Sequence, residues 1–259
     1  MLSTDFTTGS PNWLDLGSPE TAVSGAFYGA VFGWDLRSAG PDAGGYGFFQ
    51  KDGRTVAAIG PLTEEGASPA WTVYFQSPDA EATAKAVEQA GGRVRVAPTD
   101  VMEAGRLAAF TDAQGAEFAV WQPAGTSGLE TAGEPHTLWW VELSTTDRLV
   151  AYAFYQEVFG WRKQDMEIPG MTYTVVSAAE GDLEDASFGG IAEEGDDRPG
   201  WFPYFDTADV DALVSLAQEN GGSVLMPAAD VPEVGRIAWL ADPHGAAFAV
   251  IKPIPPASS

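Results

Sequence analysis

The chain contains no cysteine, few cationic residues and only two histidines. Without cysteine there is no disulfide framework, no thiolate nucleophile and no thiolate metal site. No window approaches the run of about 18 apolar residues that a membrane-spanning helix needs. Residues 1–6 lack a basic segment followed by an apolar run, so we expect no signal peptide. These absences predict a cytoplasmic protein.

Positive charge is also scarce. The 259 residues include 13 lysines and arginines against 37 aspartates and glutamates, for a formal net charge of −24. Such a balance repels the phosphate backbone of nucleic acids and disfavours binding to an anionic membrane surface. We therefore expect neither a nucleic-acid nor a membrane partner. The acidity is interpreted as a solvated surface, with a preference for cationic small molecules as the alternative.

The stretch at residues 27–34 occurs twice. It returns 127 positions later at residues 154–161, and both copies read Phe-Tyr-x-x-x-Phe-Gly-Trp. Further matches continue downstream at an offset of 130 positions, as from Phe75 to Phe205. A repeat of this length indicates a duplicated domain, because solenoid repeats run about 20 to 50 residues. The predicted organisation is a first domain at 8–123, a linker rich in Gly, Thr, Ser and Pro at 124–136, and a second domain at 137–254.

The first copy begins with a strand and a helix. Residues 11–17 alternate in polarity, which is typical of a half-buried strand. Ser18-Pro19-Glu20 then predicts a helix start with Ser18 as its cap, and Gly33 predicts the stop. A second helix is expected from Asp79 to Gly91. Strands are expected at residues 46–50, 54–59, 71–75, 93–97, 106–111 and 117–122.

The second copy repeats this pattern. A strand is expected at 138–144, followed by a helix with Thr145 or Thr146 as its cap and Asp147 in its first turn. Another helix is expected to start near Asp209. Further strands are expected at residues 171–177, 186–191, 201–205, 223–226, 236–241 and 247–252. Each copy therefore reads β-α-β-β-β twice.

A doubled β-α-β-β-β unit with Phe-Tyr-x-x-x-Phe-Gly-Trp on its first helix resembles the vicinal oxygen chelate superfamily. That superfamily includes glyoxalase I, extradiol dioxygenases and bleomycin-resistance proteins. The turns at 112–115 and 242–245, the second reading Asp-Pro-His-Gly, resemble its Asp-Pro-x-Gly turn before a final strand. More narrowly, the chain is similar to two-module actinobacterial glyoxalase-like proteins. The resemblance implies an α+β fold of four βαβββ units that form two curved-sheet cups, so that a monomer suffices. Because this fold hosts unrelated chemistries, the function depends on the site.

The superfamily holds a divalent metal through His, Glu or Gln side chains, and the resemblance locates the ligand positions in each copy. The residues at these positions are Trp13, Thr72 and Ala119 in the first copy and Trp140, Phe202 and Ala249 in the second. None is an imidazole or carboxylate ligand, and Thr72 alone carries an oxygen. His136 and His244 fall in the linker and in a turn. We therefore expect no metal and no other cofactor, which removes the Lewis acid that glyoxalase and dioxygenase chemistries need.

Aromatic residues and two acids replace the metal ligands. Strand alternation puts Trp13 with Asp15, and Trp140 with Glu142, on one face, which the resemblance identifies as the cup lining. Neighbouring strands are expected to add Thr72, Tyr74, Trp121, Phe202 and Tyr204. Such rings stack on flat ligands, and an acid anchors an amine. The predicted function is a metal-independent protein that binds and sequesters a small aromatic or cationic compound.

Asp15 and Glu142 also allow two other interpretations. They could pair with Arg106 and Arg236, which lie at equivalent places in the two copies, as structural ion pairs. They could also act as a general acid or base. The alternative function is therefore a glyoxalase-like lyase, isomerase or cyclase that acts on a small metabolite.

Overall fold

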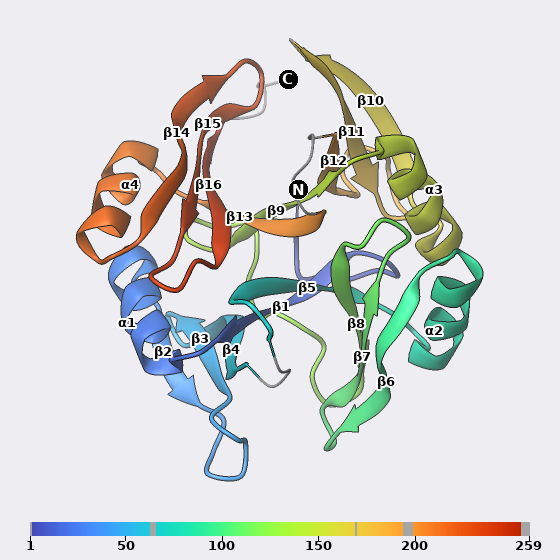
Figure 1. Cartoon of the computed structure of the whole chain (residues 1–259), viewed down its shortest axis with the longest axis horizontal. Helices are drawn as coiled ribbons and strands as arrows, with labels where there is room; N and C mark the ends of the chain where they lie inside the picture. Colours follow the sequence, from blue (N-terminus) through green and yellow to red (C-terminus); the bar gives the residue numbers. More distant parts are fainter. Residues whose placement is uncertain (1, 63–65, 169, 194–198, 255–259) are drawn as a thin grey trace. The chain divides into compact units, whose positions relative to one another are not determined.

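The computed structural model describes residues 2–62, 66–168, 170–193 and 199–254. These residues form four modules, each a strand followed by a helix and three further strands (Figure 1). Module 1 contains β1 (Pro11–Ser18), α1 (Thr21–Phe32), β2 (Asp35–Ser38), β3 (Gly47–Lys51) and β4 (Arg54–Pro61). Module 2 contains β5 (Ala70–Gln76), α2 (Ala80–Gln89), β6 (Arg93–Val101), β7 (Gly105–Thr111) and β8 (Glu117–Pro123).

The second half of the chain repeats this order. Module 3 contains β9 (Leu138–Thr145), α3 (Arg148–Phe159), β10 (Arg162–Ile168), β11 (Met171–Ser177) and β12 (Ser187–Glu193). Module 4 contains β13 (Gly200–Asp206), α4 (Val210–Glu219), β14 (Ser223–Val231), β15 (Gly235–Ala241) and β16 (Ala247–Pro253).

Each half forms one eight-stranded sheet. The strand orders are β2-β3-β4-β1-β5-β8-β7-β6 and β10-β11-β12-β9-β13-β16-β15-β14. In every module the first strand pairs in parallel with the last strand of the same module. The remaining pairs within the modules are antiparallel. The prediction of a tandem α+β fold of βαβββ units is confirmed.

The chain divides into two compact units that each draw on both repeats. Unit 1 consists of Met1–Leu14, Thr72–Leu129 and Trp140–Phe202, and so holds most of modules 2 and 3. Unit 2 consists of Asp15–Trp71, Glu130–Trp139 and Pro203–Ser259, and holds most of modules 1 and 4. Helix α2 contacts α3 within unit 1, and α1 contacts α4 within unit 2.

Aspartates cap three of the four helices. Asp79 and Asp209 cap α2 and α4 near the predicted starts. The Asp79 side chain accepts from two backbone N–H groups of the first turn, and the Asp209 side chain accepts from one. Asp147 caps α3 in the same way, so the prediction that Thr145 or Thr146 caps this helix is wrong. The Thr146 hydroxyl instead donates to Gln114 Oε1 at 2.8 Å.

Helix α1 begins differently. Its N-cap residue is Glu20, and no side chain caps it, so the predicted serine cap is wrong. The Ser18 hydroxyl accepts the Glu20 N–H at 3.1 Å and lies 2.9 Å from the Ser24 hydroxyl. Gly33 ends the helix at φ +73°, as predicted, in the left-handed conformation that favours glycine.

Strands β2 and β10 have no counterpart in the sequence prediction. All four residues of β2 are exposed, and none in β10 is buried, so neither shows the apolar alternation by which a half-buried strand is found. Antiparallel pairing with β3 and β11 supplies their backbone hydrogen bonds. They complete the three strands that follow the helix in modules 1 and 3.

The repeated aromatic motif builds the core of unit 1. Tyr155 stacks on Trp161 with 4.7 Å between ring centroids, and Phe75 meets Trp161 edge-on at 5.1 Å. The Tyr155 hydroxyl accepts from Trp201 Nε1 at 2.9 Å and donates to Asp112 Oδ2 at 3.1 Å. Burial raises the pKa of Asp112 and, together with the Asp112 charge, raises the pKa of Tyr155. The motif therefore serves packing, with a buried hydrogen-bonded chain through its tyrosine.

Unit 2 has the corresponding core. Tyr28 stacks on Trp34 at 5.8 Å between centroids, and its hydroxyl accepts from Trp71 Nε1 at 3.0 Å. Burial and the Asp242 charge raise the pKa of Tyr28. The Asp242 carboxylate accepts from the Ser24 hydroxyl at 3.2 Å.

The tryptophans of the repeated motif also donate hydrogen bonds to the segments that precede β1 and β9. Trp161 Nε1 donates to the Gly9 carbonyl, and Trp34 Nε1 donates to the His136 carbonyl, both at 2.9 Å. Next to His136, Glu134 forms a two-pronged ion pair with Arg54, which lowers the pKa of the Glu134 carboxyl. The end of the segment predicted to be a linker is therefore joined to β4 by the ion pair between Glu134 and Arg54.

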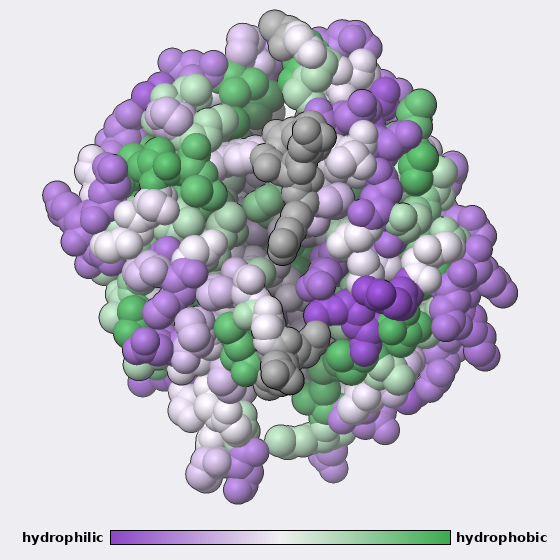
Figure 2. All heavy atoms as spheres, in the orientation of Figure 1, coloured by the Kyte–Doolittle hydropathy of each residue, from purple (hydrophilic) through white to green (hydrophobic). Residues whose placement is uncertain are grey.

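The surface agrees with the acidic composition. Figure 2 shows hydrophilic residues along α2 and β6. Among the helices that the structure describes, none combines the length and apolar character needed to cross a membrane.

Candidate functional site

The nine residues predicted to bind a ligand lie on strands of both sheets. Four of them are buried, namely Trp13, Trp121, Glu142 and Tyr204. The other five are half-buried, namely Asp15, Thr72, Tyr74, Trp140 and Phe202. Unit 2 contains Asp15 and Tyr204, and unit 1 contains the other seven.

The structure brings Trp140 and Glu142 together through a third residue, Tyr173 on β11. Trp140 Nε1 donates to the Tyr173 hydroxyl at 3.0 Å, and that hydroxyl donates to Glu142 Oε2 at 2.7 Å. Glu142 is only 7% exposed, so its carboxylate depends on such partners in place of water. We call Trp140, Glu142 and Tyr173 the Glu142 cluster. It combines an indole ring, a phenol and a fixed carboxylate.

Unit 2 contains a corresponding pair. The hydroxyl of Tyr46, just before β3, donates to Asp15 Oδ2 on β1 at 3.1 Å. The Tyr46 ring meets Phe48 edge-on at 5.8 Å between centroids. An acid on the first strand therefore accepts a hydrogen bond from a tyrosine in both repeats.

The other predicted aromatics have separate partners. Trp121 Nε1 donates to the Thr126 carbonyl at 2.8 Å, which ties β8 to the segment after it. The Tyr204 hydroxyl accepts from Trp239 Nε1 on β15 at 2.9 Å. Tyr74 on β5 pairs in register with Ala119 on β8, two residues before Trp121. Tyr204 and Trp239 are thus joined by a hydrogen bond within unit 2.

The two arginines considered as partners of the acids bind elsewhere, so that interpretation is wrong. Arg236 pairs with Asp211 through two contacts of 2.7 and 2.8 Å. Arg106 Nε lies 2.8 Å from Asp100. Both arginines thus pair with exposed acids of their own module, and tyrosines occupy the place expected for them.

The six positions of the family's metal ligands do not fit a metal. Their side chains are two indoles, a phenyl ring, a hydroxyl and two methyl groups, of which only the Thr72 hydroxyl carries a ligand atom. Over the described ranges, no group of three or more His, Cys, Asp and Glu residues is placed to hold a metal ion.

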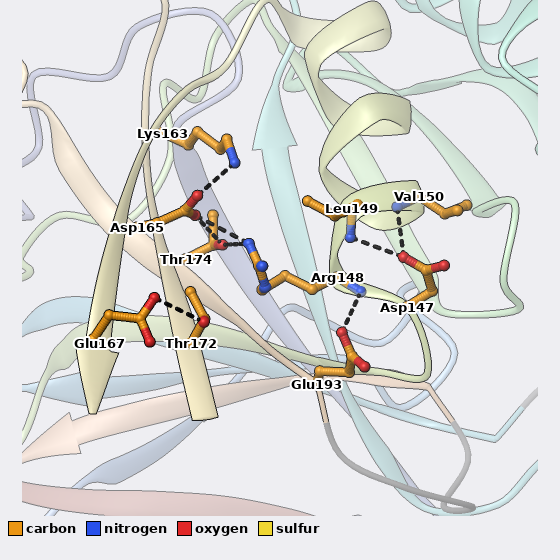
Figure 3. A network of polar contacts seen from close by, with 10 residues as sticks. All are labelled: Asp147, Arg148, Leu149, Val150, Lys163, Asp165, Glu167, Thr172, Thr174 and Glu193. Atoms are coloured by element: carbon orange, nitrogen blue, oxygen red, sulfur yellow. Dashed lines mark hydrogen bonds and ion pairs between the residues drawn. The ribbon is translucent and has the colours of Figure 1, made fainter. Parts of the chain in front are cut away.

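A polar network lies at the start of α3 (Figure 3). Arg148 Nη1 lies 3.1 Å from Asp165 Oδ1 and 2.8 Å from the Thr174 hydroxyl. Lys163 pairs with the other Asp165 oxygen at 2.7 Å, which lowers the pKa of Asp165 against the opposing effect of burial. These contacts join α3 to β10 and β11, and we interpret them as structural.

A cavity of about 320 Å³ lies in another part of unit 1. The N-terminal segment and the segment between β11 and β12 line it, with the carboxylates of Asp5, Glu180, Asp182 and Asp185. None of the nine predicted residues lines this cavity.

Sequence reasoning missed Tyr46, Tyr173 and Trp239. Tyr46 and Tyr173 are separated by the same 127 positions as Asp15 and Glu142, so the repeat itself contained the signal. Trp239 was not predicted because the equivalent position in the first copy, 130 positions earlier, is Ala109, so the repeat shows no matching aromatic residue. The strand register that brings these side chains to their partners could not be predicted from the sequence.

Comparisons with known proteins agree with this architecture. The family model described as Glyoxalase/Bleomycin resistance protein/Dioxygenase superfamily matches residues 10–120 and 137–250. The chain is 42% identical over 264 residues to the "Anthracycline biosynthesis protein DnrV" of Streptomyces peucetius, with 96% of this chain and 95% of that protein covered. It is 37% identical to the "Putative glyoxylase CFP32" of Mycobacterium tuberculosis, with 97% of each covered.

A solved structure shows the same fold at low identity. The Mn(II)-bound glyoxalase from Novosphingobium aromaticivorans superposes with a TM-score of 0.65 at 18% identity, covering 97% of this chain and 83% of that one. The two matched segments account for most of the sequence, and each contains two of the βαβββ modules. The chain therefore belongs to the glyoxalase/bleomycin resistance protein/dioxygenase superfamily.

Proposed function

We propose that this protein is a metal-independent binding protein that sequesters a flat aromatic compound carrying a positive charge. The observation that carries the proposal is the Glu142 cluster. A half-buried indole offers a stacking surface, and the carboxylate two residues away offers a fixed negative charge. Asp15 and Tyr46 offer a second acid of the same kind.

The relative from Streptomyces peucetius supports this ligand class. Its name assigns it to anthracycline biosynthesis. Anthracyclines are flat polycyclic compounds that carry an amino sugar, so they combine a stacking surface with a cation. The proposed ligand for this chain is a compound of that type.

The side chains at the family's ligand positions support metal independence. Binding energy then comes from ring stacking, and the carboxylate selects for charge. The proposed protein acts as a monomer, because one chain supplies all four modules. Its net charge of −24 favours cationic ligands over nucleic acid or anionic membranes.

Calorimetric titration tests the proposal. The probes are an anthracycline with a free amino sugar and the same compound with its amine acetylated, which differ in charge but share the ring system. We expect both to bind, the cationic one more tightly, with the same affinities before and after chelator treatment. Failure of both to bind, or loss of binding on metal removal, contradicts the proposal.

A second candidate function is a glyoxalase-like lyase, isomerase or cyclase. The hydrogen bond of 2.7 Å between Tyr173 and Glu142 is the observation that favours it, because such a pair can pass a proton to or from a bound substrate. The mycobacterial relative is named as a glyoxylase. Formation of a lactoyl thioester from methylglyoxal and a low-molecular-weight thiol, abolished in Glu142→Gln, supports this candidate, and absence of turnover counts against it.

A further inference from the structure

Tyr173 reaches Glu142 by crossing a whole strand. In the sheet, β12 lies between β11, which carries Tyr173, and β9, which carries Glu142. Gly190 on β12 is the register partner of Glu142. On its other side Gly190 pairs with Val175, two residues along β11 from Tyr173. The phenol therefore passes diagonally over Gly190 to reach the acid.

Gly190 is required for space and not for backbone conformation. Its φ angle is outside the left-handed region, so the backbone would accept other residues. A Cβ atom at this position would overlap the hydroxyl oxygen and the adjoining ring carbons of Tyr173. Any side chain at 190 therefore displaces the phenol from Glu142.

The first repeat has the acid and the tyrosine but no glycine opposite the acid. Asp15 pairs with Ala58 on β4, whereas Glu142 pairs with Gly190 on β12. Tyr46 donates to Asp15, and a Cβ at Gly60 would lie 3.0 Å from Tyr46 Cδ2. Gly60 pairs with Gly17, two residues beyond Asp15 on β1. The acid and the tyrosine thus recur, whereas the residue opposite the acid is alanine in the first repeat and glycine in the second.

The direction of the hydrogen bonds is fixed by chemistry. The Trp140 indole N–H can only donate, so the Tyr173 oxygen accepts from it. The single Tyr173 proton is then directed at Glu142, which accepts it as a carboxylate. Tyr173 is a titratable group that faces Glu142 from β11, and Gly190 is the register partner of Glu142 on β12. The Tyr173 hydroxyl is therefore bonded to both the Glu142 carboxylate and the Trp140 indole N–H.

We propose that Tyr173, accommodated by Gly190, is a positioning residue that makes Glu142 a fixed anionic anchor and thereby determines the preference for cationic over neutral aromatic ligands. This inference rests on the proposed binding function. It assigns the charge selectivity of the site to Tyr173 and Gly190, which carry no charge themselves. Tyr46 has the corresponding role for Asp15.

The test compares the two anthracycline probes, free amine and acetylated amine, on full-length variants. Tyr173→Phe keeps the ring and removes the hydroxyl. We expect the ratio of the two dissociation constants to fall about tenfold, which corresponds to about 1.4 kcal/mol, with little change for the acetylated probe. Gly190→Ala should have the same effect, and adding Tyr173→Phe to it should change nothing more. Equal weakening of both probes, or an unchanged ratio, overturns the proposal.

A rescue pair separates positioning from packing. In Tyr173→Ala/Gly190→Ser, the serine hydroxyl lies close to the place of the phenolic oxygen, whereas Tyr173→Ala/Gly190→Ala leaves that place without a donor. Selectivity should return in the serine variant and stay lost in its alanine control. Equal ratios in the two double variants overturn the proposal.

A measurement without ligand separates this inference from the binding function. In a crystal structure of Tyr173→Phe, we expect the Glu142 carboxylate to have moved from its wild-type position. An unmoved carboxylate overturns the positioning role even if both probes bind. If neither probe binds the wild-type protein, the binding function fails, and the crystal structures alone decide whether Tyr173 positions Glu142.

Discussion

The two compact units contain the same aromatic motif but use its tyrosine differently. In unit 1, Tyr155 accepts from Trp201 and donates to Asp112, so three buried side chains form one chain. In unit 2, Tyr28 accepts from Trp71, whereas the equivalent carboxylate of Asp242 accepts from Ser24.

One helical residue accounts for the difference. Ser24 in α1 corresponds to Ala151 in α3, 127 positions later, and alanine has no hydroxyl to offer. In unit 1 the carboxylate is therefore left to the tyrosine. A duplicated core can thus keep its packing while a single substitution redirects its buried hydrogen bonds.

The largest expected effect is on stability, from removal of these tyrosine hydroxyls. Tyr155→Phe leaves both the Trp201 N–H and one Asp112 oxygen without this partner, and we expect a loss of about 2–4 kcal/mol in the free energy of unfolding. Tyr28→Phe leaves only the Trp71 N–H, for a loss of about 1–2 kcal/mol. Urea denaturation measures both, and equal losses would contradict the difference between the cores.

The next effect is on ligand binding, and it compares the two acids. Glu142→Gln should weaken the cationic anthracycline probe by about 1.5–3 kcal/mol, because a charge-assisted contact is lost. Asp15→Asn should act in the same direction but less, since Asp15 is more exposed and its tyrosine bond is longer, 3.1 against 2.7 Å.

The matched control is the tryptophan on the same strand. Trp140→Ala and Trp13→Ala should weaken the cationic and acetylated probes alike, by about 0.5–1.5 kcal/mol beyond the lost contact area. Calorimetric titration of the two acid variants and the two tryptophan variants with both probes measures these changes in affinity. An acid variant that weakens both probes equally assigns that acid to structure alone.

A smaller effect concerns the pH dependence of stability. Burial raises the pKa of Asp112 above its ordinary value of 3.8, so the folded protein retains this proton at a pH where the unfolded chain has lost it. Stability therefore falls as pH rises from the unfolded to the folded pKa, and Asp112→Asn should remove this fall. Asp206 in unit 2 also has a pKa raised by burial, and Asp206→Asn should act in the same direction but less, because Asp206 is half-buried.

Unfolding in urea at a series of pH values provides this measurement. The relevant quantity is the difference in unfolding free energy between the wild type and each variant. A difference that grows in favour of the wild type as pH rises through this window contradicts the assignment.

The smallest expected effect comes from the equivalent arginines of the two units. Arg236→Met and Arg106→Met remove exposed ion pairs, which contribute little because water and salt screen them. Arg236 should matter slightly more, since it holds Asp211 through two short contacts. Any difference between the variants should vanish at high salt, and one that persists there would indicate a packing role for the arginine stem.

Much of the fold was predictable because the sequence repeats its strongest signals. Helix start signals and glycine stops located the helices, although the caps predicted for α1 and α3 were wrong, and alternation located the half-buried strands. The exposed strands β2 and β10 escaped prediction because their side chains carry no burial pattern, and only pairing with a neighbour defines them.

The candidate site was predictable in part. Alternation placed Trp140 and Glu142 on one strand face, and the structure joins them. The joining residue, Tyr173, lies two strands away, and a contact of that kind depends on register, which a single sequence does not define. The expectation of Arg106 and Arg236 as partners failed because charge complementarity in sequence says nothing about distance.

The division of each unit between the two repeats has a consequence for folding. In unit 1, Phe75 and Phe118 from the first repeat pack against Tyr155 from the second. During synthesis these phenylalanines emerge first and remain without that partner until α3 has been made. Unit 2 must wait longer, because Tyr28 packs against Phe248 on the final strand. Contacts between such distant parts of a chain slow folding, and they make both cores dependent on the completed polypeptide.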